Sequence, residues 1–295
     1  MDDLNVLLRE RNGYDSNALW IIKSCSYCDR GMFATRDIRA GELVFKDRPT
    51  VVGPKVSEMA PGCAVCMTGD LPLIACSKLC ALPVCYGGQC ENLPIHENDC
   101  KLLRQLAGDV SIDNTYWSPQ LFKSLALLRC INMPQKERNI VRLLHTHKGK
   151  QTMIQINWLK NALPNGLSDE DEKWLLHCCG VLNGLAFEIP ETNEESKKKR
   201  LHGLYPLAGM MNHSCSPNTE RLFTTEDEVP MMSVVATVDI AKDTEITTAY
   251  CPLLWSTPTR RKFLFITKEF LCYCPRCQDS TVKFHLLYSK LYKIL

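Results

Sequence analysis

Eight metal-binding side chains fall within residues 63–100, and this cluster restricts the folding of the chain more than any other feature. They form four closely spaced pairs: Cys63 and Cys66, Cys76 and Cys80, Cys85 and Cys90, and His96 and Cys100. Thiolates and imidazole are the ligands that zinc takes in closed structural sites, and eight of them serve two tetrahedral ions. Prolines and glycines interrupt the stretch, so it cannot bury enough apolar surface to fold alone. The sequence therefore predicts a zinc module that unfolds when the metal is removed.

The composition limits the class of protein. The 295 residues are 45% hydrophobic and 23% charged with a net charge of +2, as in a soluble globular protein and unlike a disordered chain or a polybasic nucleic-acid binder. The sequence shows neither an N-terminal signal peptide nor an apolar run long enough to cross a membrane. We therefore expect a reducing, intracellular compartment, in which clustered cysteines bind metal. Four cysteines outside the clusters are expected to be buried thiols: Cys25, Cys28, Cys178 and Cys179.

A second group of motifs extends through the rest of the chain. Residues 31–45 read as a strand, a charged turn and a second strand, which is a hairpin pattern. Asn212-His213 stands just before Cys215, and the apolar strand at residues 245–250 ends in Tyr250. A last cysteine cluster follows at Cys272, Cys274 and Cys277. Each motif alone is an ordinary turn or strand end, but their joint order makes that interpretation improbable.

These motifs, taken with residues 204–218, resemble the SET domain of lysine methyltransferases, and the inserted cysteine-rich module resembles the MYND zinc finger. The combination is similar to the SMYD family, and the segments around Trp255 and Phe270 are most like its arthropod SmydA branch. The resemblance covers residues 25–278. It implies an α+β fold: a SET-domain β-fold with a knot-like crossing, an inserted finger, a helical insertion and a post-SET zinc site. The C-terminal helical domain of the family is expected to be missing.

The expected organisation follows from the resemblance and from local patterns. Apolar residues at three-to-four spacing and an acidic helix start after Ser168 predict the helical insertion. A second helix start, with Pro at the first helical position, is expected at Thr257-Pro258. The predicted segments are 1–62 (N-terminal SET), 63–100 (finger), 101–183 (helical insertion), 184–256 (core SET), 257–280 (post-SET) and 281–295 (a short tail).

The resemblance implies an S-adenosylmethionine-dependent protein-lysine N-methyltransferase acting on histone or other proteins. Transfer to lysine is an in-line displacement by a neutral amine, so an apolar, aromatic-lined channel helps by disfavouring the ammonium form. Tyr250 is expected to orient the substrate amine and the methyl group, and also to contact the cofactor. The remaining cofactor-binding residues implied by the family are Arg30, Gly31, Asn212, His213 and Phe270, the last stacking on adenine.

The resemblance also implies how twelve ligands share three zinc ions. The sets are Cys63, Cys66, Cys85 and Cys90; Cys76, Cys80, His96 and Cys100; and Cys215, Cys272, Cys274 and Cys277. Expected partners are a protein with an accessible lysine and proline-containing peptides at the finger. The finger has no dense stripe of basic residues, which argues against direct DNA binding. We also expect a monomer that is located in the nucleus and cytoplasm, is linked to transcription regulation and makes no membrane contact.

One alternative belongs to another class, a catalytically impaired SET scaffold that acts through the finger as a transcriptional corepressor. It is motivated by three departures from the family pattern, one of which is the expected lack of the C-terminal helical domain. Asp29 stands where the family has a glycine, and Leu185 stands where it has a cofactor-binding Asn, with Asn183 two residues out of register. Cofactor binding separates the two hypotheses.

Overall fold

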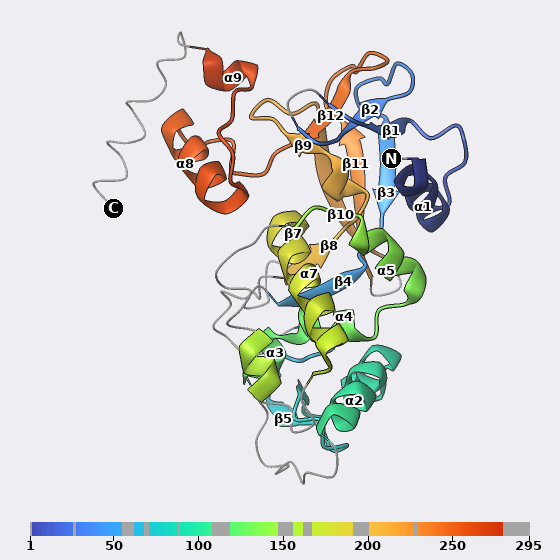
Figure 1. Ribbon diagram of the computed structural model, residues 1–295, viewed down its shortest axis with the longest axis vertical. Helices are drawn as coiled ribbons and strands as arrows, with labels where there is room; N and C mark the ends of the chain where they lie inside the picture. Colours follow the sequence, from blue (N-terminus) through green and yellow to red (C-terminus); the bar gives the residue numbers. More distant parts are fainter. Residues whose placement is uncertain are drawn as a thin grey trace. The chain divides into compact units, whose positions relative to one another are not determined.

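The chain is described by a computed structural model that covers residues 2–25, 28–54, 62–67, 71–87, 89–107, 119–146, 156–161, 167–190, 201–226 and 229–279. It divides into two compact units (Figure 1). The first joins the two ends of the sequence, Met1–Arg48 and Pro206–Leu295, and the second is the intervening Pro49–Tyr205. The α+β expectation is confirmed, while the predicted tail at 281–295 lies outside the described residues.

Two small sheets form the first unit. The first sheet has the order β1-β2-β12-β9, with β1 Trp20–Lys23, β2 Gly31–Ala34, β12 Glu245–Thr248 and β9 Asn212–His213. The second has the order β10-β11-β3, with β10 Thr219–Glu226, β11 Val229–Ala236 and β3 Leu43–Asp47. Its helices are α1 Asp2–Asn12, the 3-10 turn η2 Ala208–Met210, α8 Thr257–Lys268 and α9 Pro275–Gln278. The β9–β12 pair is parallel, and the other pairs are antiparallel.

The expected hairpin over residues 31–45 is wrong in its pairing. Both strands form, but β2 pairs with β1 and β12, whereas β3 pairs with β11 in the other sheet. The corner at Gly41 explains the difference, because its φ of +84° suits glycine and its N–H donates to the carbonyl of Ala236, 2.7 Å away. The turn therefore passes the chain from one sheet to the other.

The second unit is mainly helical. Its strands are β4 Val51–Pro54, β8 Leu201–Leu204 and β7 Ala186–Ile189, in the order β4-β8-β7, and the separate pair β5 Leu73–Ala75 and β6 Pro83–Cys85. Its helices are η1 Cys90–Asn92, α2 Pro94–Ala107, α3 Pro119–Lys123, α4 Leu125–Ile131, α5 Gln135–Arg142 and α7 Asp169–Leu185, with another helical stretch at 156–161. The helical insertion is thus present, and Leu121, Leu125 and Leu128 are buried in it.

Helix α7 begins where the sequence predicts. The Ser168 side chain accepts a hydrogen bond from the N–H of Asp171, and four acidic residues occupy the first turn. Asn183 and Leu185 belong to the last turn of this helix. At α8 the N-cap is Ser256, which accepts from the N–H of Thr259.

Arg129 on α4 holds the finger against the rest of the second unit. Its guanidinium forms an ion pair of 2.8 Å with the buried Asp99 on α2 and donates to the carbonyls of Val52 and Ala64. Because one side chain contacts three segments, burial of this charge is compensated on all sides. In the described residues no helix is long and apolar enough to cross a membrane.

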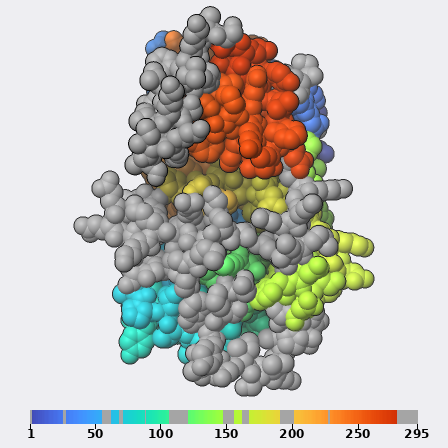
Figure 2. All heavy atoms as spheres, turned by 90° about the vertical axis from the view of Figure 1, so that its left-hand side faces the viewer, coloured from blue at the N-terminus to red at the C-terminus, as the bar shows by residue number. Residues whose placement is uncertain are grey.

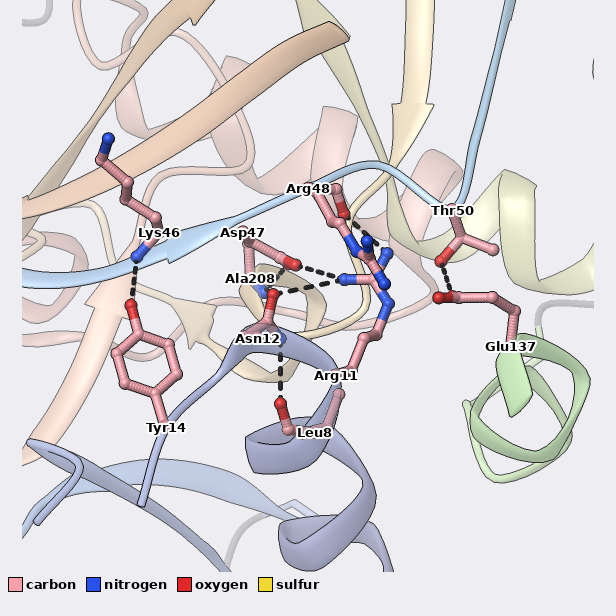
Figure 3. Close-up of polar contacts among 10 residues, drawn as sticks. All are labelled: Leu8, Arg11, Asn12, Tyr14, Lys46, Asp47, Arg48, Thr50, Glu137 and Ala208. Carbon is pink, nitrogen blue, oxygen red and sulfur yellow. Dashed lines mark hydrogen bonds and ion pairs between the residues drawn. The ribbon is translucent and has the colours of Figure 1, made fainter. Parts of the chain in front are cut away.

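A buried ion pair holds the first unit together (Figure 3). The Arg11 guanidinium on α1 lies 2.9 Å from the Asp47 carboxylate on β3 and also donates to the carbonyl of Arg48. The N–H of Ala208 donates to the other carboxylate oxygen at 2.9 Å. Both charged side chains are almost fully buried. The contact therefore fixes α1 and β3 to the segment that leads into Asn212.

Burial raises the pKa of Asp47 to about 6, although Arg11 and the backbone N–H donors oppose it. A raised carboxyl pKa means that the folded state binds a proton more tightly than the unfolded chain, so this contribution to stability is lost as pH rises from about 4 to about 6. We expect the free energy of unfolding of Asp47→Asn, relative to wild type, to rise by up to about 3 kcal/mol over that range. Urea unfolding at several pH values measures it, and a pH-independent difference would contradict the assignment.

Removing the cation alone leaves an uncompensated carboxylate in the core. Arg11→Met should lower the free energy of unfolding by about 3–5 kcal/mol above pH 7. The matched control is Arg36→Met, because the Arg36–Glu42 pair lies at the solvent-exposed surface and should contribute little to stability. Equal losses in the two variants, measured by urea unfolding, would show that the Arg11 contact is not structural.

Candidate functional site

A polar corner in the first unit is built around Asn212. Its amide nitrogen donates to the Glu245 carboxylate at 2.7 Å, to the carbonyl of Arg30 at 3.0 Å and to Cys28 Sγ at 3.0 Å. A Cβ on Gly31 would lie 2.5 Å from Glu245 and 2.9 Å from the Asn212 amide. Only glycine therefore allows β2 to approach β9 and β12 this closely. The structure thus joins the predicted residues Arg30, Gly31 and Asn212 in one place.

Glu245 belongs to the same corner, and no sequence motif pointed to this residue by itself. Burial raises its pKa to about 7, so near neutral pH the carboxyl exchanges readily between its charged and neutral forms. Asp29, in contrast, is exposed and pairs with Arg30 at 3.5 Å, with its carboxylate mostly in solvent. Leu185 and Asn183 lie in the second unit, on α7.

His213 uses both ring nitrogens within the protein. Its Nδ1 accepts from the N–H of Tyr250 at 2.9 Å, which assigns the ring proton to Nε2, and Nε2 lies 3.2 Å from Cys215 Sγ. The imidazole thus connects Tyr250 to a predicted zinc ligand. Its ring face and its backbone remain for the predicted cofactor contact.

Tyr250 lies at the end of the segment that follows β12. Its hydroxyl donates to the carbonyl of Met211 at 2.6 Å. Burial raises its pKa well above the ordinary value, although Arg221 opposes this, so the side chain stays a neutral phenol at physiological pH. It can orient a bound group through its hydroxyl oxygen, but it does not serve as a phenolate base.

Aromatic side chains pack together beside the ring of Tyr250. The ring of His213 lies 5.4 Å from that of Tyr250 and 6.0 Å from that of Phe270, measured between centroids. The ammonium of Lys268 lies 5.7 Å from the centroid of Tyr250. The predicted aromatic residues therefore form one cluster with an amine on one of its faces.

The four sulfur atoms of the post-SET cluster lie within 4.8 Å of one another, in the predicted set. Cys215 Sγ lies 3.5 Å from that of Cys277 and 4.0 Å from that of Cys272, where a tetrahedral ion with Zn–S bonds of about 2.3 Å needs about 3.8 Å. The buried guanidinium of Arg260 donates to Cys215 Sγ at 3.1 Å. A cation beside thiolates favours their deprotonated, metal-binding form. The donor set fits zinc.

The finger brings its eight ligands together in the two predicted groups. Cys66 and Cys85 lie 3.5 Å apart in the group that also contains Cys63 and Cys90. This group combines one exposed thiol with buried ones. Its sulfur spacing also suits a tetrahedral ion.

The second finger group is fully buried. His96 Nε2 lies 3.2 Å from Cys76 Sγ and 3.9 Å from Cys80 Sγ, so the ring presents this nitrogen to the sulfur atoms. Hydrogen bonding from Cys80 is the main reason that the pKa of Cys76 lies well below its ordinary value. One thiol is thus prepared to be a thiolate ligand.

Sequence reasoning missed several residues of these sites. Cys251 lies with His213 and Cys215 within 4.8 Å, beside the post-SET cluster. Cys25 and Cys28, expected to be thiols, form a disulfide next to Asn212, so that expectation is wrong. The two residues between them allow the two sulfur atoms to come into contact. The expected burial of Cys178 and Cys179 is confirmed.

Comparison with known proteins agrees with this geometry. The SET domain model matches residues 29–251. The SET domain-containing protein SmydA-8, isoform A, of Drosophila melanogaster is 34% identical over 89% of this chain and 56% of its own length. The histone-lysine N-methyltransferases ASHR1 of Arabidopsis thaliana and SMYD3 of Homo sapiens are 27% and 25% identical, each over 85% of this chain and over 53% and 59% of their own lengths. The chain thus spans a little over half the length of these relatives. The chain belongs to the SET-domain family, and its sequence is similar to those of SMYD and SmydA proteins.

Proposed function

We propose that this protein is an S-adenosylmethionine-dependent protein-lysine N-methyltransferase. The observation that carries the proposal is the pairing of β9 with β12, which sets the Asn212 corner beside the Tyr250 cluster within one unit. The names of the relatives SMYD3 and ASHR1, both histone-lysine N-methyltransferases, support the same reaction class. When bound, S-adenosylmethionine supplies a methyl group on a cationic sulfonium.

Different residues of this site would position different parts of the cofactor. Asn212 uses its amide nitrogen within the protein, so we assign its carbonyl oxygen to the ammonium of the cofactor. Glu245 provides a carboxylate at the same corner that can balance this positive charge. Gly31 has no side chain that would crowd Glu245 and the Asn212 amide. Phe270 and the ring of His213 provide apolar faces for adenine.

Tyr250 orients the substrate amine. Its hydroxyl is held by the Met211 carbonyl, so the oxygen lone pairs are fixed in space and can accept a hydrogen bond from the lysine nitrogen. The neighbouring rings of His213 and Phe270 would exclude water and disfavour the charged form of the substrate lysine. The neutral amine is then left to attack the methyl group.

The three cysteine clusters are proposed zinc sites with different tasks. The post-SET site would tie the α8–α9 segment to the Asn212-His213 strand through Cys215, and His213 would transmit its position to Tyr250. The finger sites would replace the missing apolar core of residues 63–100. Exposed apolar side chains on the finger, among them Tyr86 and Leu71, support the proposed docking of proline-containing peptides.

The wider role extends the same proposal. We propose that the substrate is a histone or non-histone protein with an accessible lysine. We further propose that the protein acts in transcription regulation in the nucleus and cytoplasm. We further assign a monomer that acts without membrane contact or direct DNA binding.

Zinc removal should unfold the finger and release the post-SET segment. We expect three zinc ions per chain in wild type and two in Cys85→Ser and in Cys274→Ser, each variant losing one four-ligand site. Cys179→Ser is the matched control, because this buried thiol belongs to none of the three clusters and should keep all three ions. Metal analysis by atomic emission gives the counts, and near-ultraviolet circular dichroism after chelation follows unfolding. Unchanged spectra in the chelated protein would refute a structural role of zinc.

The enzymatic proposal separates into binding and transfer. Asn212→Ala should weaken S-adenosylmethionine binding about tenfold or more, measured by calorimetric titration of zinc-loaded protein, because the corner loses its central amide. Tyr250→Phe should keep that affinity within about threefold but slow methyl transfer to histone or other protein substrates by about 100-fold or more.

A folded, zinc-replete wild-type protein that releases no heat with S-adenosylmethionine would exclude the enzyme. It would favour the impaired scaffold, whose peptide binding should then be lost in Cys85→Ser. Equal affinity of wild type and Asn212→Ala would instead exclude the assignment of the corner to the cofactor.

A further inference from the structure

We propose that Lys268 is a self-methylation site, so that the Tyr250 site transfers a methyl group to a lysine of its own chain. The inference rests on the proposed function, since it uses the same cofactor and the same hydroxyl. It adds a modification site at a position where a ring contact places an amine and the course of the backbone leads to the same aromatic cluster.

The first observation is the position of the side chain. Lys268 is the last residue of α8, and its Nζ lies 5.7 Å from the ring centroid of Tyr250, within the range of a cation–aromatic contact. The amine therefore faces the residue whose hydroxyl we assign to orienting a substrate lysine. Figure 2 shows the α8 segment at the surface of the molecule, and the Lys268 side chain on this helix is only partly exposed.

The second observation is the course of the backbone. Glu269 caps α8 in the left-handed conformation, with a φ of 60° that is uncommon for a residue other than glycine. The chain reverses there, and Phe270 comes to lie 6.0 Å from the ring of His213, which itself contacts Tyr250. Lys268 and Phe270 therefore approach the same aromatic cluster from the two sides of one turn.

The environment prepares the amine for reaction. Burial lowers the pKa of Lys268 to about 8. At pH 7.5 about a quarter of such amines are neutral, against roughly one in a thousand for an exposed lysine with a pKa of about 10.4. The neutral form is the nucleophile, and attachment to the same chain raises its effective concentration at the site.

The reaction balances without any further reagent. The lone pair of Nζ forms a bond to the methyl carbon of S-adenosylmethionine, and the carbon–sulfur bond breaks with its electron pair left on sulfur. S-adenosylhomocysteine leaves, and the additional proton on nitrogen passes to water. The product remains an amine that can be protonated, so its contact with the Tyr250 ring persists.

The placement of the lysine can be tested without cofactor. In protein labelled at its lysines, the ε-methylene signals of Lys268 should be shifted upfield by the Tyr250 ring, and Tyr250→Leu should remove that shift. Lys262 is the matched control, because it lies exposed on the same helix and should show no shift. Absence of the shift in folded wild type would overturn the proposal.

The modification is tested by incubating the full zinc-loaded chain with S-adenosylmethionine carrying a deuterated methyl group, followed by peptide mapping by mass spectrometry. We expect label on Lys268 at a first-order rate independent of protein concentration. Lys268→Arg should remove that label, and Lys262→Arg should leave it unchanged. A Tyr250→Phe chain mixed with wild type should stay at least tenfold less labelled at Lys268, as self-modification requires.

The outcomes separate the two proposals. If calorimetry shows cofactor binding but Lys268 remains unlabelled, self-methylation is refuted and the enzymatic proposal stands. Equal labelling of the Tyr250→Phe chain by wild type would refute self-methylation in favour of transfer between molecules. If the cofactor does not bind to folded protein, both proposals fail together.

Discussion

The parallel pairing of β9 with β12 is the contact on which the rest of the first unit depends. It sets Asn212 opposite Thr247 and His213 opposite Thr248, although these residues come from distant parts of the chain. Asn212 then reaches Glu245 and the carbonyl of Arg30, while His213 reaches the N–H of Tyr250. The two residues of β9 thus bring the polar corner and the aromatic cluster together, because the position of a residue in a strand fixes the direction of its side chain.

Clusters of soft metal ligands replace an apolar core in segments that have too little apolar surface to form one. The finger brings eight such ligands into two groups, and Arg129 fastens it to the second unit through Asp99 and two carbonyls. The post-SET segment follows the same logic, with Arg260 beside the sulfur atoms of Cys215 and Cys277. In both places an arginine with little solvent exposure supports the ligand cluster, because guanidinium can satisfy several acceptors at once.

Burial acts in one direction on the titrating groups of the first unit. It raises the pKa of Asp47, Glu245 and Tyr250 and lowers that of Lys268, so that each favours its neutral form. At Asp47 this effect opposes the ion pair with Arg11, and the contacts of the carboxylate with Arg11 and Ala208 link α1, β3 and η2. At Tyr250 and Lys268 it places a neutral phenol beside a partly neutral amine, which is the arrangement that the proposed methyl transfer would use.

The sequence by itself determined what depends on residues close together along the chain. Ligand spacing indicated the closely spaced pairs of zinc ligands, and capping by Ser168 indicated the start of α7, because short spacings and caps are local properties. The division of the ligands into three groups came from the resemblance to the family. Resemblance pointed to Asn212, His213 and Tyr250. Only the tertiary structure decided which distant residues join them: Glu245 at the Asn212 amide, Arg260 at Cys215, the separation of β2 and β3 into two sheets, and Lys268 over the Tyr250 ring. These contacts arise from the pairing and packing of segments remote in sequence, for which no local pattern of residues exists.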